Sequence, residues 1–150
     1  MTWYTTLKKI REHHPCVEGW KKLLAHLGKT TADDEKIAIS TILESNGLDD
    51  AVWCLRAVDG KDKEIRLFAV WCARQVEHLL TDQRSKDVIT AAEKFANGEA
   101  TEEELQAARA AARDAWDAAS AAAWAARAAA WDAWDAANEA QSARLLEMVE

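Results

Sequence analysis

A histidine–cysteine cluster near the start of the chain is the first place where this sequence could do chemistry. His13, His14 and Cys16 put three potential metal ligands within four residues. Zinc sites usually contain a Cys-x-x-Cys or His-x-x-x-His pair, and neither pair occurs in this sequence. No glycine-rich phosphate-binding motif and no Gly-x-Ser-x-Gly motif occurs either. We therefore expect no metal, no cofactor and no catalytic residue in this chain, and we expect it not to be an enzyme.

Tryptophan and arginine recur on one side of the alanine-rich C-terminal third, where they could recognise a partner. At about 100° per residue, the tryptophans form one helical stripe with an acidic row beside it. Tryptophan and arginine are enriched at interface hot spots, and a guanidinium can stack on an indole ring. The partner-binding residues that we predict are Trp116, Trp124, Trp131, Trp134, Arg109 and Arg127 on the stripe, with Asp114, Asp117, Asp132 and Asp135 in the acidic row.

Two other interpretations of this stripe stay open. The tryptophans could pack on the first hundred residues of the same chain, with the arginines at the edge of that contact. The acidic row could serve only to keep an alanine-rich helix in solution. Residues 101–150 carry a net charge of −6, and residues 1–100 carry −1. A nucleic-acid binder needs a basic surface, so we expect no nucleic-acid partner; an acidic surface favours a basic protein partner.

The elements that must position these residues are helical. Four glycines (Gly28, Gly47, Gly60 and Gly98) stand where helical patterns stop, and Thr101 with Glu104 has the spacing of a capping box. Thr31 with Asp34 has a similar start signal, and no stretch alternates long enough to predict a strand. The sequence therefore predicts an all-α fold. We expect helices near residues 3–13, 15–27, 32–46, 49–58, 62–80, 85–97 and 102–148.

Alanine content divides the chain into two parts. Residues 101–143 contain 21 alanines in 43 positions, which predicts one long helix that either projects or breaks near Asn138 and folds back. We expect a core domain over 1–98, built as a compact bundle of about six short helices. The long helix of 99–150 would pack on that core or on a partner. The hexapeptide of residues 51–56 recurs almost unchanged at 69–74, which predicts two core helices that pack as a pair.

The ends and the hydropathy of the chain bear on where it resides. The first residues show no charged segment leading into an apolar run, and no stretch of eighteen apolar residues occurs. The three cysteines have no paired spacing that would indicate a disulfide framework. We therefore expect a cytoplasmic protein with no membrane contact.

The middle of the chain resembles the immunity-protein family of bacteria and their phages. The likeness is strongest in RLFAVWCARQVEHLL (66–80) and in ANGEATEEEL (96–105), and it extends over roughly residues 15–137. Shorter matches are PCVEGW (15–20), DQR (82–84) and VITAA (88–92). The resemblance implies a helical accessory domain that neutralises a toxin by binding it, with no catalytic residue to carry over.

Three classes of function follow from these observations. The first is a non-catalytic binding protein, of the toxin-neutralising or phage counter-defence kind, that occludes a protein partner such as a basic toxin or defence protein. The second is a structural helical module that associates with itself. The third is a protein that binds or sequesters a small, nucleotide-like molecule in a tryptophan-lined pocket.

Overall fold

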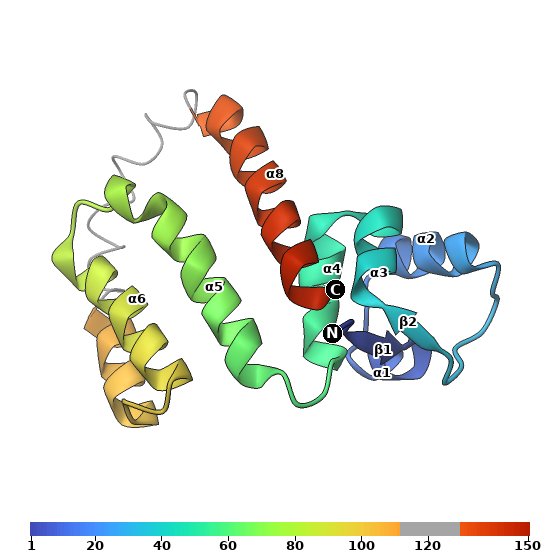
Figure 1. The fold of residues 1–150 in the computed structure, drawn as a ribbon, viewed down its shortest axis with the longest axis horizontal. Helices are drawn as coiled ribbons and strands as arrows, with labels where there is room; N and C mark the ends of the chain where they lie inside the picture. The colour runs from blue at the N-terminus through green and yellow to red at the C-terminus, as the bar shows by residue number, and fades with distance from the viewer. Residues whose placement is uncertain (112–129) are drawn as a thin grey trace. The chain divides into compact units, whose positions relative to one another are not determined.

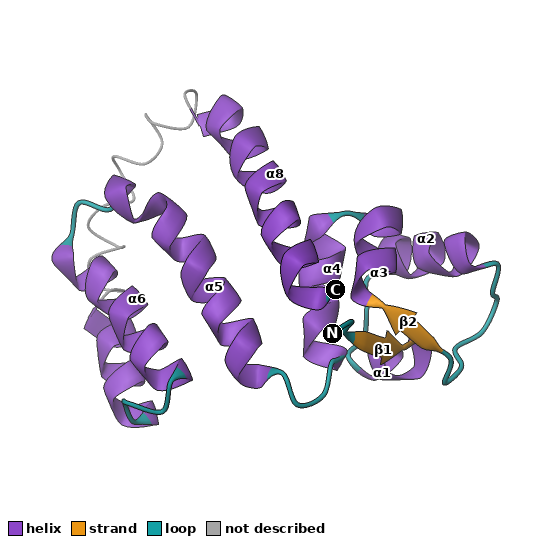
Figure 2. Ribbon diagram, in the orientation of Figure 1, coloured by secondary structure: helices purple, strands orange, loops and turns teal. Residues whose placement is uncertain are grey.

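The computed structural model of the chain describes residues 1–111 and 130–150, with side chains for 1–111 and 137–150. In these residues the secondary structure is helical apart from one pair of short strands, which confirms the all-α class (Figure 2). The chain forms two compact units, Met1–Lys61 with Asn138–Glu150 and Asp62–Ala137. We call these unit 1 and unit 2. This division differs from the boundary at residue 98 that alanine content suggests.

The strand pair lies in unit 1 and corrects the prediction that the chain has no strand. Strand β1 (Tyr4–Thr6) pairs antiparallel with β2 (Lys36–Ala38), with Thr5 opposite Ile37. Three residues are too few for an alternating pattern to stand out from a helical one, so both segments read as the beginnings of helices. Both Thr5 and Ile37 are buried, and the Thr5 hydroxyl donates to the Ala57 carbonyl at 2.6 Å.

The first and third helices of unit 1, each of which follows a strand, consequently begin later than predicted. The first helix begins at Leu7 rather than at Trp3; Thr6 precedes it, and the Thr6 hydroxyl accepts from the Lys9 N–H. Thr31 caps no helix, because the chain continues without regular structure into β2. The elements of unit 1 after β1 are α1 (Leu7–Glu12), α2 (Val17–Leu27), β2, α3 (Ile39–Asn46), α4 (Leu48–Cys54) and the short 3₁₀ helix η1 (Leu55–Ala57).

The C-terminal end of the chain completes the core of unit 1. Helix α8 (Ala130–Val149) passes through Asn138 without interruption, so the alternative of a break near Asn138 is wrong; one asparagine among good helix formers costs too little to end a helix. Leu145 and Val149 are fully buried. The Trp3 N–H donates to the Val149 carbonyl at 2.7 Å, which ties the two chain ends together (Figure 1).

Unit 2 is built on two helices that lie side by side, α5 (Asp62–Val76) and α6 (Gln83–Ala96), with the 3₁₀ helix η2 (Glu77–Leu79) between them (Figure 1). A further helical segment covers residues 102–111. Its predicted capping box is confirmed: the Thr101 N–H donates to Glu104 Oε2 at 2.7 Å, and the Glu104 N–H donates to Thr101 Oγ1 at 3.2 Å. Before it, Gly98 adopts a positive φ of 76°, which glycine tolerates best.

Among the described helices, none has the length and apolar character needed to cross a membrane.

Candidate functional site

Of the ten predicted partner-binding residues, Arg109 is the one whose side chain the structure describes. It lies in the helical segment 102–111 of unit 2. Residues Trp116, Trp124, Arg127, Asp114 and Asp117 lie outside the described residues. Trp131, Trp134, Asp132 and Asp135 belong to the backbone of α8, and their side chains are outside the description. The predicted tryptophan stripe therefore stays a prediction.

Arg109 borders a groove of about 330 Å³ in unit 2. Helices α5 and α6 and the segment 102–111 form its walls, and its lining is mostly apolar. Val70, Ile89 and Leu105 are buried at its floor. The remaining lining residues are Arg66, Ala69, Ala73, Val88, Ala92, Phe95, Glu102 and Arg109. We call this the unit 2 groove.

The charged residues of the unit 2 groove are all exposed. Arg66 and Arg109 supply two guanidinium groups, and Glu102 supplies one carboxylate. The Arg66 guanidinium carbon lies 5.0 Å from the centre of the Phe95 ring, within the range of a cation–π contact. The groove therefore combines an apolar floor with a rim that can bind a carboxylate or another anion.

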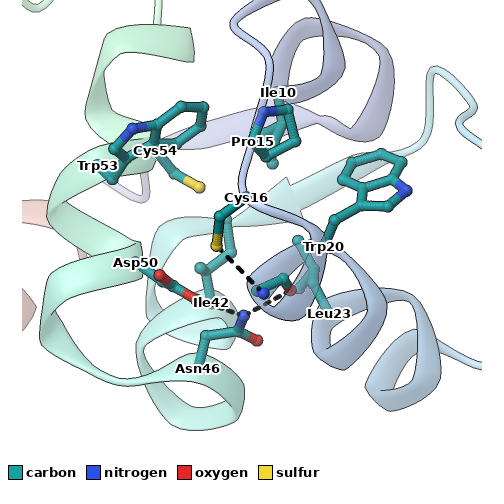
Figure 3. Close-up of a pocket in the computed structure, with 11 residues that line it drawn as sticks. Ile10, Pro15, Cys16, Trp20, Leu23, Ile42, Asn46, Asp50, Trp53 and Cys54 are labelled. Atoms are coloured by element: carbon teal, nitrogen blue, oxygen red, sulfur yellow. Dashed lines mark hydrogen bonds between the residues drawn. The ribbon is translucent and has the colours of Figure 1, made fainter.

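A second, smaller cavity lies in unit 1 and brings two thiols together (Figure 3). It measures about 90 Å³, and Cys16 and Cys54 both line it, from the start of α2 and the end of α4. The indole rings of Trp20 and Trp53 border the same space. The other lining residues are Ile10, Pro15, Gly19, Leu23, Ile42, Asn46 and Asp50. We call this the thiol cavity.

Polar contacts hold the wall of the thiol cavity in place. Cys16 caps α2, and its sulfur accepts from the Gly19 N–H at 3.3 Å. The Asn46 amide donates to the Gly19 carbonyl at 2.9 Å and to Asp50 Oδ2 at 2.7 Å, so one side chain of α3 joins α2 to α4 (Figure 3). A Cβ on Gly19 would lie 2.6 Å from Asp50 Oδ2, so a larger residue there would require the Asp50 side chain to move.

The two buried or partly buried thiols of the chain are hard to ionise. Burial, reinforced by the nearby Asp50 carboxylate and opposed by Arg56, raises the pKa of Cys54 to about 12. Burial also raises the pKa of Cys72 in unit 2. Cys16, in contrast, is exposed. Cys16 is thus the accessible thiol of the thiol cavity, and Cys54 is its protonated neighbour.

Sequence reasoning found one half of the thiol cavity and missed the other. It singled out His13, His14 and Cys16, and the structure leaves both histidines exposed. It did not connect Cys16 with Cys54, because no local spacing links residues on separate helices. Within the described part of the chain, no three His, Cys, Asp or Glu side chains are arranged to hold a metal ion.

Comparison with family models, with curated proteins and with solved structures found no match to this chain.

Proposed function

We propose that this chain is a non-catalytic binding protein that occludes a protein partner, in the manner of a toxin-neutralising immunity protein or a phage counter-defence protein. The unit 2 groove is the observation that carries the proposal. A protein that acts by occlusion needs a complementary surface and no chemistry of its own. An apolar hollow rimmed by arginine is the composition that interface centres favour.

The lining of the groove indicates what the partner would place there. Ala69, Ala73 and Ala92 have short side chains, so a bulky apolar or aromatic group can approach the helix backbones closely. The guanidinium groups of Arg66 and Arg109 favour a carboxylate beside that group. The expected anchor is therefore a large apolar side chain with an acidic neighbour.

The charge of the chain indicates the wider surface of the partner. Residues 101–150 carry a net charge of −6, which attracts a basic protein and speeds its encounter with this chain. The proposed partner is thus a protein with a basic surface that also carries an apolar anchor and an acidic neighbour. A basic toxin or defence protein would meet this description.

The test compares one substitution in the groove with one beside it. Ala69→Glu adds a carboxylate to the groove next to its arginine rim, whereas Ala107→Glu adds the same charge at an exposed position that does not line the groove. Both changes keep a good helix former. A partner is first isolated with the tagged chain from cells of the source species, then purified and titrated against each variant.

We expect a one-to-one complex with the partner. Ala69→Glu should weaken its affinity about tenfold or more, a loss of about 1.4 kcal/mol in binding free energy. Ala107→Glu should leave the affinity unchanged. Binding by the unmodified chain should also weaken at high salt. Equal binding by the two variants would overturn the proposal, as would turnover of the partner. A dimer of the chain that Ala69→Glu dissociates would identify a second copy as the occupant and so favour the self-associating module.

A second candidate function is the binding of a small anionic aromatic molecule. The volume of the unit 2 groove reaches the lower end of the range of about 300–1,000 Å³ for such sites. Phe95 offers a ring for stacking, and Arg66 and Arg109 offer partners for a phosphate. Calorimetric titration with ATP tests it: saturable binding that Ala69→Glu abolishes would support this function, and absence of heat in the unmodified chain would exclude it for ATP.

A further inference from the structure

The thiol cavity is lined by two cysteines with different surroundings, one exposed and one buried. Cys16 is exposed and stands at the N-terminal end of the 11-residue helix α2, where its sulfur accepts from the Gly19 N–H. Cys16 is therefore the thiol that a reagent from solution would meet first.

The burial and orientation of Cys54 are a second observation, which does not depend on the position of Cys16 at the start of α2. Cys54 is 4% exposed, and its sulfur points into the cavity toward the side on which Cys16 lies (Figure 3). In the described part of the chain, the Cys54 sulfur makes no hydrogen bond. A buried polar atom without a partner that faces a cavity is a candidate for chemistry with whatever enters that cavity.

We propose that Cys16 is a site of reversible oxidation by a peroxide and that Cys54 resolves the oxidised sulfur as a disulfide across the thiol cavity. In the first step the Cys16 sulfur attacks one oxygen of hydrogen peroxide and the O–O bond breaks. Cys16 becomes a sulfenic acid, and the released hydroxide takes up the Cys16 thiol proton to form water. In the second step the Cys54 sulfur attacks the Cys16 sulfur, the S–O bond breaks, and the hydroxide leaves as water with the Cys54 thiol proton. Two thiols are oxidised by two electrons in total, and one peroxide is reduced to two waters.

The two cysteines line the same cavity. The cavity of about 90 Å³ has room for the added oxygen and for a movement of Cys16. Cys16 lies between helices, after the turn in which His14 has a φ of 56°, while Cys54 is held in α4 with its neighbour Leu55 buried. Asn46 keeps the first turn of α2 against α4 throughout. We therefore expect Cys16, rather than Cys54, to move when the disulfide forms.

The experiment treats the full chain with a slight excess of hydrogen peroxide and maps its peptides by mass spectrometry without reduction. We expect a product lighter by two hydrogens, with the peptides of Cys16 and Cys54 joined, and recovery of the starting mass with dithiothreitol. The Cys72→Ala variant, which changes the cysteine of unit 2, should give the same product. Formation of a disulfide that contains Cys72, or of the sulfonic acid of Cys16 alone, would overturn the proposal.

Two further variants separate the roles of the thiols. Cys54→Ser should leave Cys16 as a sulfenic acid that dimedone traps. Cys16→Ser keeps a good N-cap residue, so helix α2 is retained, and Cys54 should then stay unoxidised. Circular dichroism verifies that each variant is folded. Oxidation of Cys54 in the Cys16→Ser variant at the rate of the unmodified chain would contradict the order of steps.

Discussion

Two copies of almost the same hexapeptide behave differently in the two units. Residues 51–56 in unit 1 and residues 69–74 in unit 2 differ only where Leu55 stands in place of Ala73. Both copies begin in an α-helix, yet their burial is different. Val52 is 38% exposed, whereas Val70 is 6% exposed. The same local sequence therefore turns a different side toward the core of each unit.

The arginines that end the two copies show the same divergence. The Arg56 guanidinium carbon lies 4.4 Å from the centre of the Trp53 ring, and its Nε donates to the Trp53 carbonyl at 2.8 Å. Arg74 instead donates to Glu77 at 2.9 Å and to Glu93 at 2.6 Å, and so connects α5 with η2 and α6. The hexapeptide therefore determines a helix, while the neighbouring elements determine its contacts. Both copies contribute buried side chains to a core, as predicted, but they do so through different faces.

The substitution with the largest expected effect makes the two copies identical. Leu55→Ala removes a side chain that is 2% exposed from the core of unit 1, so we expect a loss of about 2–5 kcal/mol in the free energy of unfolding. Val52→Ala, at an exposed position of the same copy, should cost less than about 1 kcal/mol. Urea denaturation measures both values. Equal costs would mean that the two copies do not differ in their packing.

A pH dependence should distinguish the cysteines of the two copies. Burial holds the pKa of Cys54 at about 12 in the folded chain, above its value in the unfolded chain, so the unfolded chain ionises first as pH rises. The contribution of Cys54 to the free energy of unfolding is complete below the pKa of the unfolded chain, near pH 9. Between pH 9 and 12 this contribution declines by up to about 1.4 kcal/mol per pH unit. Cys54→Ala should reduce the decline in unfolding free energy over this range.

The control for this prediction is Cys72→Ala, which removes the less buried cysteine of the second copy. Burial raises the pKa of Cys72 in the same direction, and we expect its substitution to change the slope less than Cys54→Ala does. The other titratable groups are the same in every variant, so the difference between variants isolates the thiols. A steeper change for Cys72→Ala would reverse the order that we infer.

The smallest expected effect concerns the two arginines. Arg74→Ala removes ion pairs at a site where the arginine side chain is 32% exposed, which should cost about 0.5–1 kcal/mol at low salt and less at high salt. Arg56→Ala removes a contact with an indole ring, worth about 0.5–1 kcal/mol, with a weaker dependence on salt. Thermal unfolding at two salt concentrations measures both. The same salt dependence for both variants would contradict the difference between their contacts.

The sequence predicted those helix ends whose signals are local. The capping box of Thr101 and Glu104 is present, and Gly28 ends α2 with a φ of 65°. Each signal involves atoms a few residues apart, so the surrounding fold changes it little. The helix predicted near residues 49–58 begins at Leu48 instead, directly after Gly47, and no side chain caps it. A helix start without a local cap was therefore predicted less exactly.

The candidate sites were less predictable than the helices. Arg109 was singled out as a member of the predicted stripe, but the unit 2 groove that it borders also needs Arg66 and Phe95 from α5 and α6. Cys16 was noticed for its histidine neighbours, whereas its functional neighbour in our proposal is Cys54. Both sites are assembled from separate helices, and no spacing within one segment encodes them.

The amino-acid sequence alone determined three properties: the helical class, most of the helix ends in unit 2 and the acidic charge of the last third. These properties depend on backbone propensity, capping and charge, which act over a few residues. The strand pair, the burial of Val149 beside Trp3 and the meeting of two thiols required the folded chain. They depend on contacts between residues far apart in sequence, and the packing of the whole unit selects among such contacts because local preferences are too weak to do so.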